Sequence, residues 1–283
     1  MNGADTETVA DVLAKRRDCL DALADGPVEK RDLVDRLDTP RTTLDRAVGE
    51  LTDVGLAEAA NGGYRATTFG REALAVHDDY RSRLGGLTDA AELLDALPAD
   101  TALCADFLDG ADVHLSCPDA PDGVVDVLLD SVSDDARIRG VAPVALTGHV
   151  ESFGDAAGGG AEPPELVVTP GVLDHLVETL GDGVKQSVRD GEMRLRCGRV
   201  PARFGLWLTG DDQAGVVVYT DTGVRGVALN DDEDAVEWAR DRFARVRDRS
   251  APVTPAVVDD VAAGDFDFSA DRADADVDAD AAG

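Results

Sequence analysis

Hydroxyl and guanidinium side chains gather between residues 39 and 46, where the chain carries Thr39, Arg41, Thr42, Thr43 and Arg46. Arginine pairs with phosphate and with the edge of guanine, and threonine contacts phosphate or the methyl group of thymine. Residues before and after this stretch offer the same chemistry: Lys30, Arg31, Tyr64 and Arg65. These residue types indicate a surface that contacts the backbone and base edges of a nucleic acid.

The elements expected around these residues would hold them on one surface. Apolar residues at helical spacing predict helices over residues 9–23, 28–37 and 40–54, with Thr39 as the N-cap residue of the third helix and Pro40 at its first position. Asn61-Gly62-Gly63 then predicts a tight hairpin over residues 57–66. Three helices followed by a hairpin are the elements of a winged helix-turn-helix.

The stretch "TPRTTLDRAVGELTDVGLAE" resembles the recognition helix of winged-helix regulators from archaea and bacteria, and the similarity covers about residues 9–75. The resemblance implies that the helix at about residues 40–54 enters the major groove of double-stranded DNA, with the wing at 57–66 beside it. Two alternatives stay open. The arginines are solvated surface residues of an ordinary three-helix bundle, or the unit is a winged-helix module that binds a protein.

Residues 68–97 predict one long helix or two, with a bend at Gly85-Gly86. A helix in this position can pair with the same helix of a second copy, so a homodimer is expected. The alternative is a helix that packs only within its own chain. The domain prediction is therefore a winged helix-turn-helix at 1–76 and a helical linker at 77–100.

From about Asp112 the pattern changes to alternating strands and helices, which predicts an α/β domain with bounds of 101–250. Expected strands are "ADVHLSC", "ARIRGVAPVA", "PELVVTP", "EMRLRCG", "FGLWLTG", "AGVVVYTD" and "GVRGVALN", and expected helices are "GVVDVLLDSVS", "GVLDHLVETLG" and "DEDAVEWARDRFARVRDRS". The predicted fold class of the whole chain is α+β.

The order of these elements and the ending "FGLWLTGDDQAGVVVYTDTGVRGVALNDDEDAVEWARDRFARVRDRS" resemble the sensor domain of methanogenesis-regulator-type (FilR-type) archaeal proteins. The resemblance implies a transcriptional regulator whose second domain senses a ligand or mediates dimerisation. A pocket for an unknown small-molecule effector would be lined by Trp207, Tyr219 and Arg225. The alternative is that the aromatic residues are plain core.

The remaining reactive side chains predict no enzyme. The histidines at 77, 114, 149 and 175 have no metal-binding spacing, and the chain contains no phosphate-binding loop or nucleophile elbow. Cys19, Cys104, Cys117 and Cys197 form no CxxC pair. We therefore expect no catalytic residue, no metal and no cofactor.

The formal net charge is −31, with 45 Asp and 13 Glu against 24 Arg and 3 Lys. Excess short carboxylates and scarce lysine favour a halophilic protein in molar salt, where screening mutes self-repulsion. An acidic protein with a basic partner is the alternative. Between Val9 and Glu72 the chain has ten basic and thirteen acidic residues, so the predicted DNA-binding domain is near charge balance.

The acidic end of the chain, residues 251–283, is predicted to be a disordered tail. No apolar run approaches the roughly 20 residues of a membrane-spanning helix. A cytoplasmic location is therefore expected.

Overall fold

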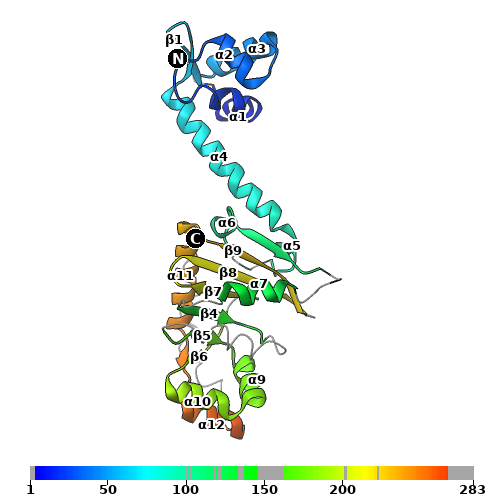
Figure 1. The fold of residues 1–283 in the computed structure, drawn as a ribbon, viewed down its shortest axis with the longest axis vertical. Helices are drawn as coiled ribbons and strands as arrows, with labels where there is room; N and C mark the ends of the chain where they lie inside the picture. The colour runs from blue at the N-terminus through cyan, green and yellow to red at the C-terminus, as the bar shows by residue number, and fades with distance from the viewer. Residues whose placement is uncertain are drawn as a thin grey trace. The chain divides into compact units, whose positions relative to one another are not determined.

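The computed structural model describes residues 4–99, 101, 103–117, 119, 123–132, 137–145, 162–200, 203–221 and 223–266. The chain divides into two compact units, Met1–Leu84 and Gly85–Gly283. Helices and strands occur in both, as Figure 1 shows, so the mixed α+β class predicted from the sequence is confirmed.

The first unit contains the predicted three helices and hairpin in the predicted order. Its elements are α1 (Thr6–Asp21), α2 (Lys30–Leu37), α3 (Arg41–Asp53), β1 (Ala57–Ala60), β2 (Gly63–Ala66) and the greater part of α4 (Thr68–Asp89). Their apolar faces meet in one core, in which Leu20, Leu33, Leu44, Leu51 and Leu56 are at most 1% exposed. Burial of this stripe leaves the polar residues of α3 on the solvent side.

The hairpin turns at Asn61 and Gly62, whose φ angles of 47° and 82° are both positive. This combination is typical of a type I′ turn, which matches the twist of the two strands. Beyond the turn, Tyr64 exchanges two backbone hydrogen bonds with Val28, of 2.8 and 3.0 Å. The hairpin is thereby fastened to the segment that leads into α2.

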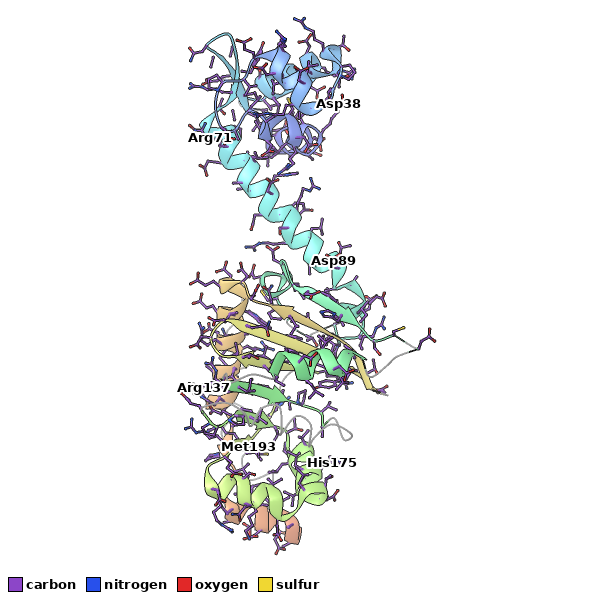
Figure 2. The ribbon with its side chains drawn as sticks, viewed as in Figure 1. Asp38, Arg71, Asp89, Arg137, His175 and Met193 are labelled. Carbon is purple, nitrogen blue, oxygen red and sulfur yellow. The ribbon has the colours of Figure 1, made fainter. Side chains whose placement is uncertain are left out.

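The predicted N-cap of α3 is wrong. The helix begins at Arg41 with Pro40 as its N-cap residue, and no side chain caps it. Asp38, labelled in Figure 2, takes the left-handed conformation that ends α2. This turn brings the Thr39 hydroxyl to the end of α2, where it donates a 2.9 Å hydrogen bond to the carbonyl of Leu37.

The second unit is built on an eight-stranded sheet in the order β10-β6-β5-β4-β7-β8-β9-β3. The strands are β3 (Asp112–Leu115), β4 (Ile138–Ala142), β5 (Glu165–Val168), β6 (Arg194–Cys197), β7 (Phe204–Thr209), β8 (Gln213–Thr220), β9 (Gly223–Asn230) and β10 (Ala251–Pro252). Strands β4, β5 and β6 run parallel, and the other neighbouring pairs are antiparallel. The seven strands from β3 to β9 are those predicted from the sequence.

Helices cover both faces of this sheet. The helices are α5 (Ala91–Asp95), α6 (Ala105–Leu108), α7 (Gly123–Val132), α9 (Pro170–Leu180), α10 (Asp182–Asp190), α11 (Glu233–Asp248) and α12 (Pro255–Ala263). Helices α5, α6 and α11 share one apolar cluster with β7 and β8, and α7 shares another with β7, β8 and β9. A third cluster joins α9, α10 and α12 to β5 and β6.

Two boundaries differ from the sequence prediction. Helix α4 continues through Gly85-Gly86, where a bend was predicted, and ends at Asp89. The predicted disordered tail is wrong at its start, because β10 pairs with β6 and α12 packs in the third cluster through Val258, which is 2% exposed. Residues 251–266 contain enough apolar side chains to pack against the domain in spite of their acidic residues. The rest of the tail, from residue 267, lies outside the described residues.

Candidate nucleic-acid interface

A groove of about 620 Å³ opens between the start of α2, the start of α3 and the hairpin. Its lining is Glu29, Lys30, Arg31, Arg41, Ala59, Ala60, Asn61, Gly62, Gly63 and Tyr64. Four residues predicted from the sequence to bind DNA line this one groove: Lys30, Arg31, Arg41 and Tyr64. The fold therefore brings together residues that are up to 34 positions apart in the chain.

Backbone packing sets the shape of the groove. Gly63 stands so close to the segment before α2 that a Cβ on it would lie 2.2 Å from the carbonyl oxygen of Val28. Only a residue without a side chain permits this approach. On the other wall, Leu33 and Leu44 are buried and anchor α2 and α3 in the core. Both walls are therefore held by the core and by backbone hydrogen bonds.

Lys30 lies at the centre of the polar contacts in the groove. Its Nζ is 2.7 Å from a carboxylate oxygen of Asp45 on α3 and 5.2 Å from the centre of the Tyr64 ring. The hydrogen bond to Asp45 raises the pKa of Lys30. The same bond lowers the pKa of Asp45, and the nearby charge of Arg41 lowers it further. Lys30 is therefore a firmly protonated cation that already has an internal anion as its partner.

Three nearby arginines make no such direct contact in the part of the chain that the structure describes, although the charges of Arg41 and Arg46 help to lower the pKa of Asp45 and of Glu50. Among the described residues, the exposed side chains of Arg31, Arg41 and Arg46 make no hydrogen bond or ion pair within 4 Å. Arg41 is the first residue of α3, whose N-terminus has no side-chain cap. Uncapped N–H groups and the positive end of the helix dipole favour an anion at this position. The arrangement suits a phosphate.

The other predicted residues are placed differently. Thr42 and Thr43 are exposed on the first turn of α3 beside Arg41. Arg65 pairs across the hairpin with Glu58, at 2.6 Å, so its charge is already balanced. Thr39 is engaged with Leu37, as described above. Roles in DNA binding for these residues stay predictions.

Sequence reasoning missed the two carboxylates that hold the basic side chains. Asp45 and Glu58 each neutralise one predicted DNA-binding residue in this structure. The helical spacing shows that Asp45 faces outward with Arg41. Its contact with Lys30, however, depends on how α2 crosses α3, which one helix pattern does not reveal. The Glu58–Arg65 pair was predictable from the hairpin register.

The residues predicted to bind an effector lie on β7, β8 and β9. The Trp207 ring packs over Gly215, where a Cβ would lie 2.1 Å from it, and the Tyr219 hydroxyl lies over Gly205. Both aromatic residues belong to the apolar cluster under α7, and burial raises the pKa of Tyr219. Arg225 forms an ion pair with Glu92 on α5. The three side chains are thus engaged in packing and pairing, and their role in ligand binding stays a prediction.

Within the part of the chain that the structure describes, no group of three or more His, Cys, Asp or Glu side chains is arranged to hold a metal ion. A search of the same residues finds no helix that is both long and apolar enough to cross a membrane.

Two family models match the chain, one in its first part and one in its second, and the first match extends past Leu84 into the second unit. Residues 4–97 match the family described as the HVO_A0261 N-terminal domain. Residues 121–249 match the family described as the middle domain of methanogenesis regulatory protein FilR1. The second match supports the sequence-based resemblance of residues 101–250 to methanogenesis regulators.

Comparison with curated proteins finds no match. Among solved structures, the chain is similar to TrmBL2, described as an archaeal chromatin protein with a novel mode of DNA binding, at 11% identity and a TM-score of 0.38, over 88% of this chain and 100% of that chain. It is also similar to Nuc, a phospholipase D family member from Salmonella typhimurium, at 11% identity and a TM-score of 0.40, over 51% of this chain and 97% of that chain. TM-scores in this range do not establish a common fold.

Proposed function

We propose that the chain is a DNA-binding transcriptional regulator and that its first unit is a winged helix-turn-helix. Helix α3 would lie in the major groove of double-stranded DNA, with the β1–β2 hairpin as the wing. The observation that carries this proposal is a set of three guanidinium groups without a hydrogen bond or ion pair to any described residue, in a chain of charge −31: Arg31 and Arg41 line the groove beside an uncapped helix N-terminus, and Arg46 lies further along the same helix. The match to a methanogenesis regulatory protein supports the regulatory role.

The groove would divide the work of binding between its walls. Arg31 and Lys30 on α2 suit the phosphate backbone, while Arg41 and Arg46, five positions apart on α3, would reach base edges. At molar salt, releasing counterions from the DNA gains little free energy, so phosphate contacts contribute little to the affinity. Base-edge contacts from α3 would therefore carry much of the specificity.

Replacing Arg31 and Arg41 by alanine, singly and together, tests the proposal. We expect Arg41→Ala to weaken binding by about 1–3 kcal/mol and to relax sequence preference, and Arg31→Ala to weaken binding less, and equally for all sequences, because a phosphate contact contributes little in concentrated salt. The measurement is fluorescence anisotropy in concentrated KCl with a duplex selected from a random pool by the wild-type protein. Arg81→Ala on α4 is the control, because it removes an exposed arginine outside the groove.

The competing function is a winged-helix module that binds a protein. It is favoured if the double variant keeps the wild-type circular dichroism and the wild-type DNA affinity, or if no duplex is enriched from the pool. The net negative charge of the chain favours this alternative, because DNA is also negatively charged.

Removal of the internal anion gives an opposite prediction. Lys30 must leave Asp45 to bind a phosphate, and the Asp45 carboxylate would repel that phosphate. Asp45→Asn should therefore strengthen DNA binding several-fold. Asp53→Asn, on the last turn of the same helix, removes an equal charge away from the groove. Equal effects of the two changes in the anisotropy measurement would show that only net charge matters.

A further inference from the structure

Helix α4 carries an apolar stripe on its solvent side. Phe69, Val76, Tyr80 and Leu84 are 52%, 70%, 61% and 46% exposed. Steps of seven, four and four residues put them on one face of the helix, with Ala73 among them. Large apolar side chains exposed in a continuous row mark an interaction surface rather than scattered surface residues.

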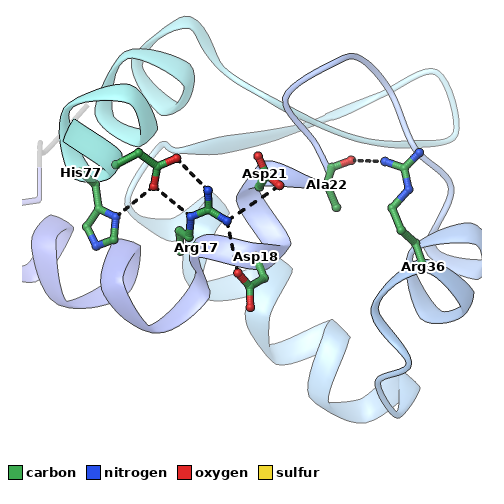
Figure 3. Close-up of polar contacts among 7 residues, drawn as sticks. Arg17, Asp18, Asp21, Ala22, Arg36 and His77 are labelled. Atoms are coloured by element: carbon green, nitrogen blue, oxygen red, sulfur yellow. Dashed lines mark hydrogen bonds and ion pairs between the residues drawn. The ribbon is translucent and has the colours of Figure 1, made fainter. Parts of the chain in front are cut away.

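The opposite side of α4 is fixed to the first unit. Leu74 is 7% exposed in the core, and Gly70 sits where a Cβ would be 1.9 Å from the carbonyl oxygen of Leu56. The Arg17 guanidinium of α1 donates hydrogen bonds of 2.9 and 2.8 Å to the carboxylate of Asp78 on α4. Figure 3 shows Arg17 pointing toward the turn of α4 that carries His77. These contacts fix the rotation of α4 about its axis, so the stripe cannot turn toward the core of its own unit.

We propose that the stripe is covered by α4 of a second copy of this chain, running antiparallel. A two-fold axis beside Val76 would place Phe69 against Leu84 of the second copy. It would also bring Tyr80 of the second copy over Ala73, a small side chain that is partly buried against the core of its own unit. Such a surface is self-complementary, as a two-fold dimer requires.

Charges beside the stripe favour the same direction. Glu72 and Arg83 lie on one flank of the stripe, eleven positions apart. Antiparallel pairing brings Glu72 of each copy near Arg83 of the other. Parallel pairing would leave these two groups roughly 16 Å apart along the axis, at a rise of about 1.5 Å per residue. Arg83 also binds Asp79 of its own chain at 3.1 Å, which keeps its guanidinium beside the stripe.

The interface rests on the stripe alone, and no part of it requires DNA binding. Its first test is the molar mass in concentrated KCl without DNA, by light scattering after gel filtration. We expect a dimer for the wild-type chain and a monomer for Val76→Glu at the same micromolar concentration. Ala75→Glu is the matched control, because it adds the same charge at the neighbouring exposed position, off the stripe. It should remain a dimer.

Cysteine pairs then test the direction. With Cys104 and Cys117 replaced by serine, a mixture of Phe69→Cys and Leu84→Cys chains should form a disulfide between the two kinds of chain on oxidation. Phe69→Cys alone should not, because antiparallel helices separate these positions by about 22 Å. A disulfide in Phe69→Cys alone would overturn the antiparallel arrangement. A monomeric wild-type chain, or a dimer that survives Val76→Glu, would overturn the interface.

Discussion

Replacing Gly86 by alanine should destabilise the second unit by about 3 kcal/mol, whereas the same change at the adjacent Gly85 should stabilise it by up to about 1 kcal/mol. Both glycines lie inside α4, where alanine is ordinarily the better helix former. A Cβ at Gly86 would be 1.9 Å from the carbonyl oxygen of Leu108, and a Cβ at Gly85 would meet nothing within 4 Å. The close approach of Leu108 therefore makes alanine destabilising at Gly86, whereas alanine is stabilising at Gly85.

The backbone that Gly86 touches has little freedom to move away. The buried amide of Asn230 donates hydrogen bonds of 2.8 Å to the carbonyls of Phe107 and Asp109, on either side of Leu108. Phe107 and Leu108 are both fully buried in the core beneath α11. An added methyl group must therefore shift α4 or break these bonds.

Urea denaturation followed by far-ultraviolet circular dichroism, with tryptophan fluorescence reporting on the second unit, measures both variants. Trp207 and Trp238 both lie in that unit, so the fluorescence transition follows it specifically. If both variants gained stability, the contact between α4 and Leu108 would be absent in solution. Equal losses at both positions would point instead to a general need for flexibility at this point of the helix.

This glycine pair illustrates what a sequence pattern cannot predict. The pair Gly85-Gly86 suggested a bend, because glycine weakens a helix. In the structure, the helix is continuous, and Gly86 allows its backbone to approach the backbone of Leu108, more than twenty residues away in the chain. Contacts of that kind leave no periodic signal in either segment.

Patterns within one element were predicted well. Helical spacing identified α1, α3 and α11, and strand alternation identified the strands from β3 to β9. Helix α10 was missed because its apolar side consists of only two residues, Val184 and Val188, which stand four positions apart in an otherwise polar stretch. At the acidic end, counting charge hid the apolar positions Val253 and Val258, which pack against Leu195 and its neighbours.

The candidate site shows the same division. Residue type and spacing selected Lys30, Arg31, Arg41 and Tyr64, which line one groove. Neither type nor spacing could show that Lys30 is held by Asp45, since that pair depends on the crossing of two helices. Only the three-dimensional structure therefore distinguishes Lys30, which is paired, from Arg31 and Arg41, which make no ion pair with the residues described. We accordingly expect the two arginines to contribute more to DNA binding than Lys30.

Salt should change the stability of the whole chain more than any single substitution outside the core. The chain carries a net charge of −31. At 0.01 M salt the Debye length is about 30 Å, comparable to the size of a unit, so carboxylates across each unit repel one another. At 1 M it is about 3 Å, and only groups in contact interact.

Concentrated KCl also weakens the ion pairs seen here, such as Arg17–Asp78 and Arg65–Glu58, but exposed pairs each contribute at most about 1 kcal/mol. Repulsion acts among a large excess of carboxylates. Screening that repulsion should therefore stabilise the fold by more than the weakening of the ion pairs destabilises it. We expect the thermal midpoint to rise by about 10 °C or more between 10 mM and 2 M KCl, which corresponds to roughly 3–5 kcal/mol. Circular dichroism melting curves measure this, with sucrose as an uncharged control for solute exclusion. A midpoint that is flat in KCl, or that rises equally in sucrose, would show that charge repulsion does not limit the fold and would favour a basic partner as the reason for the acidic surface.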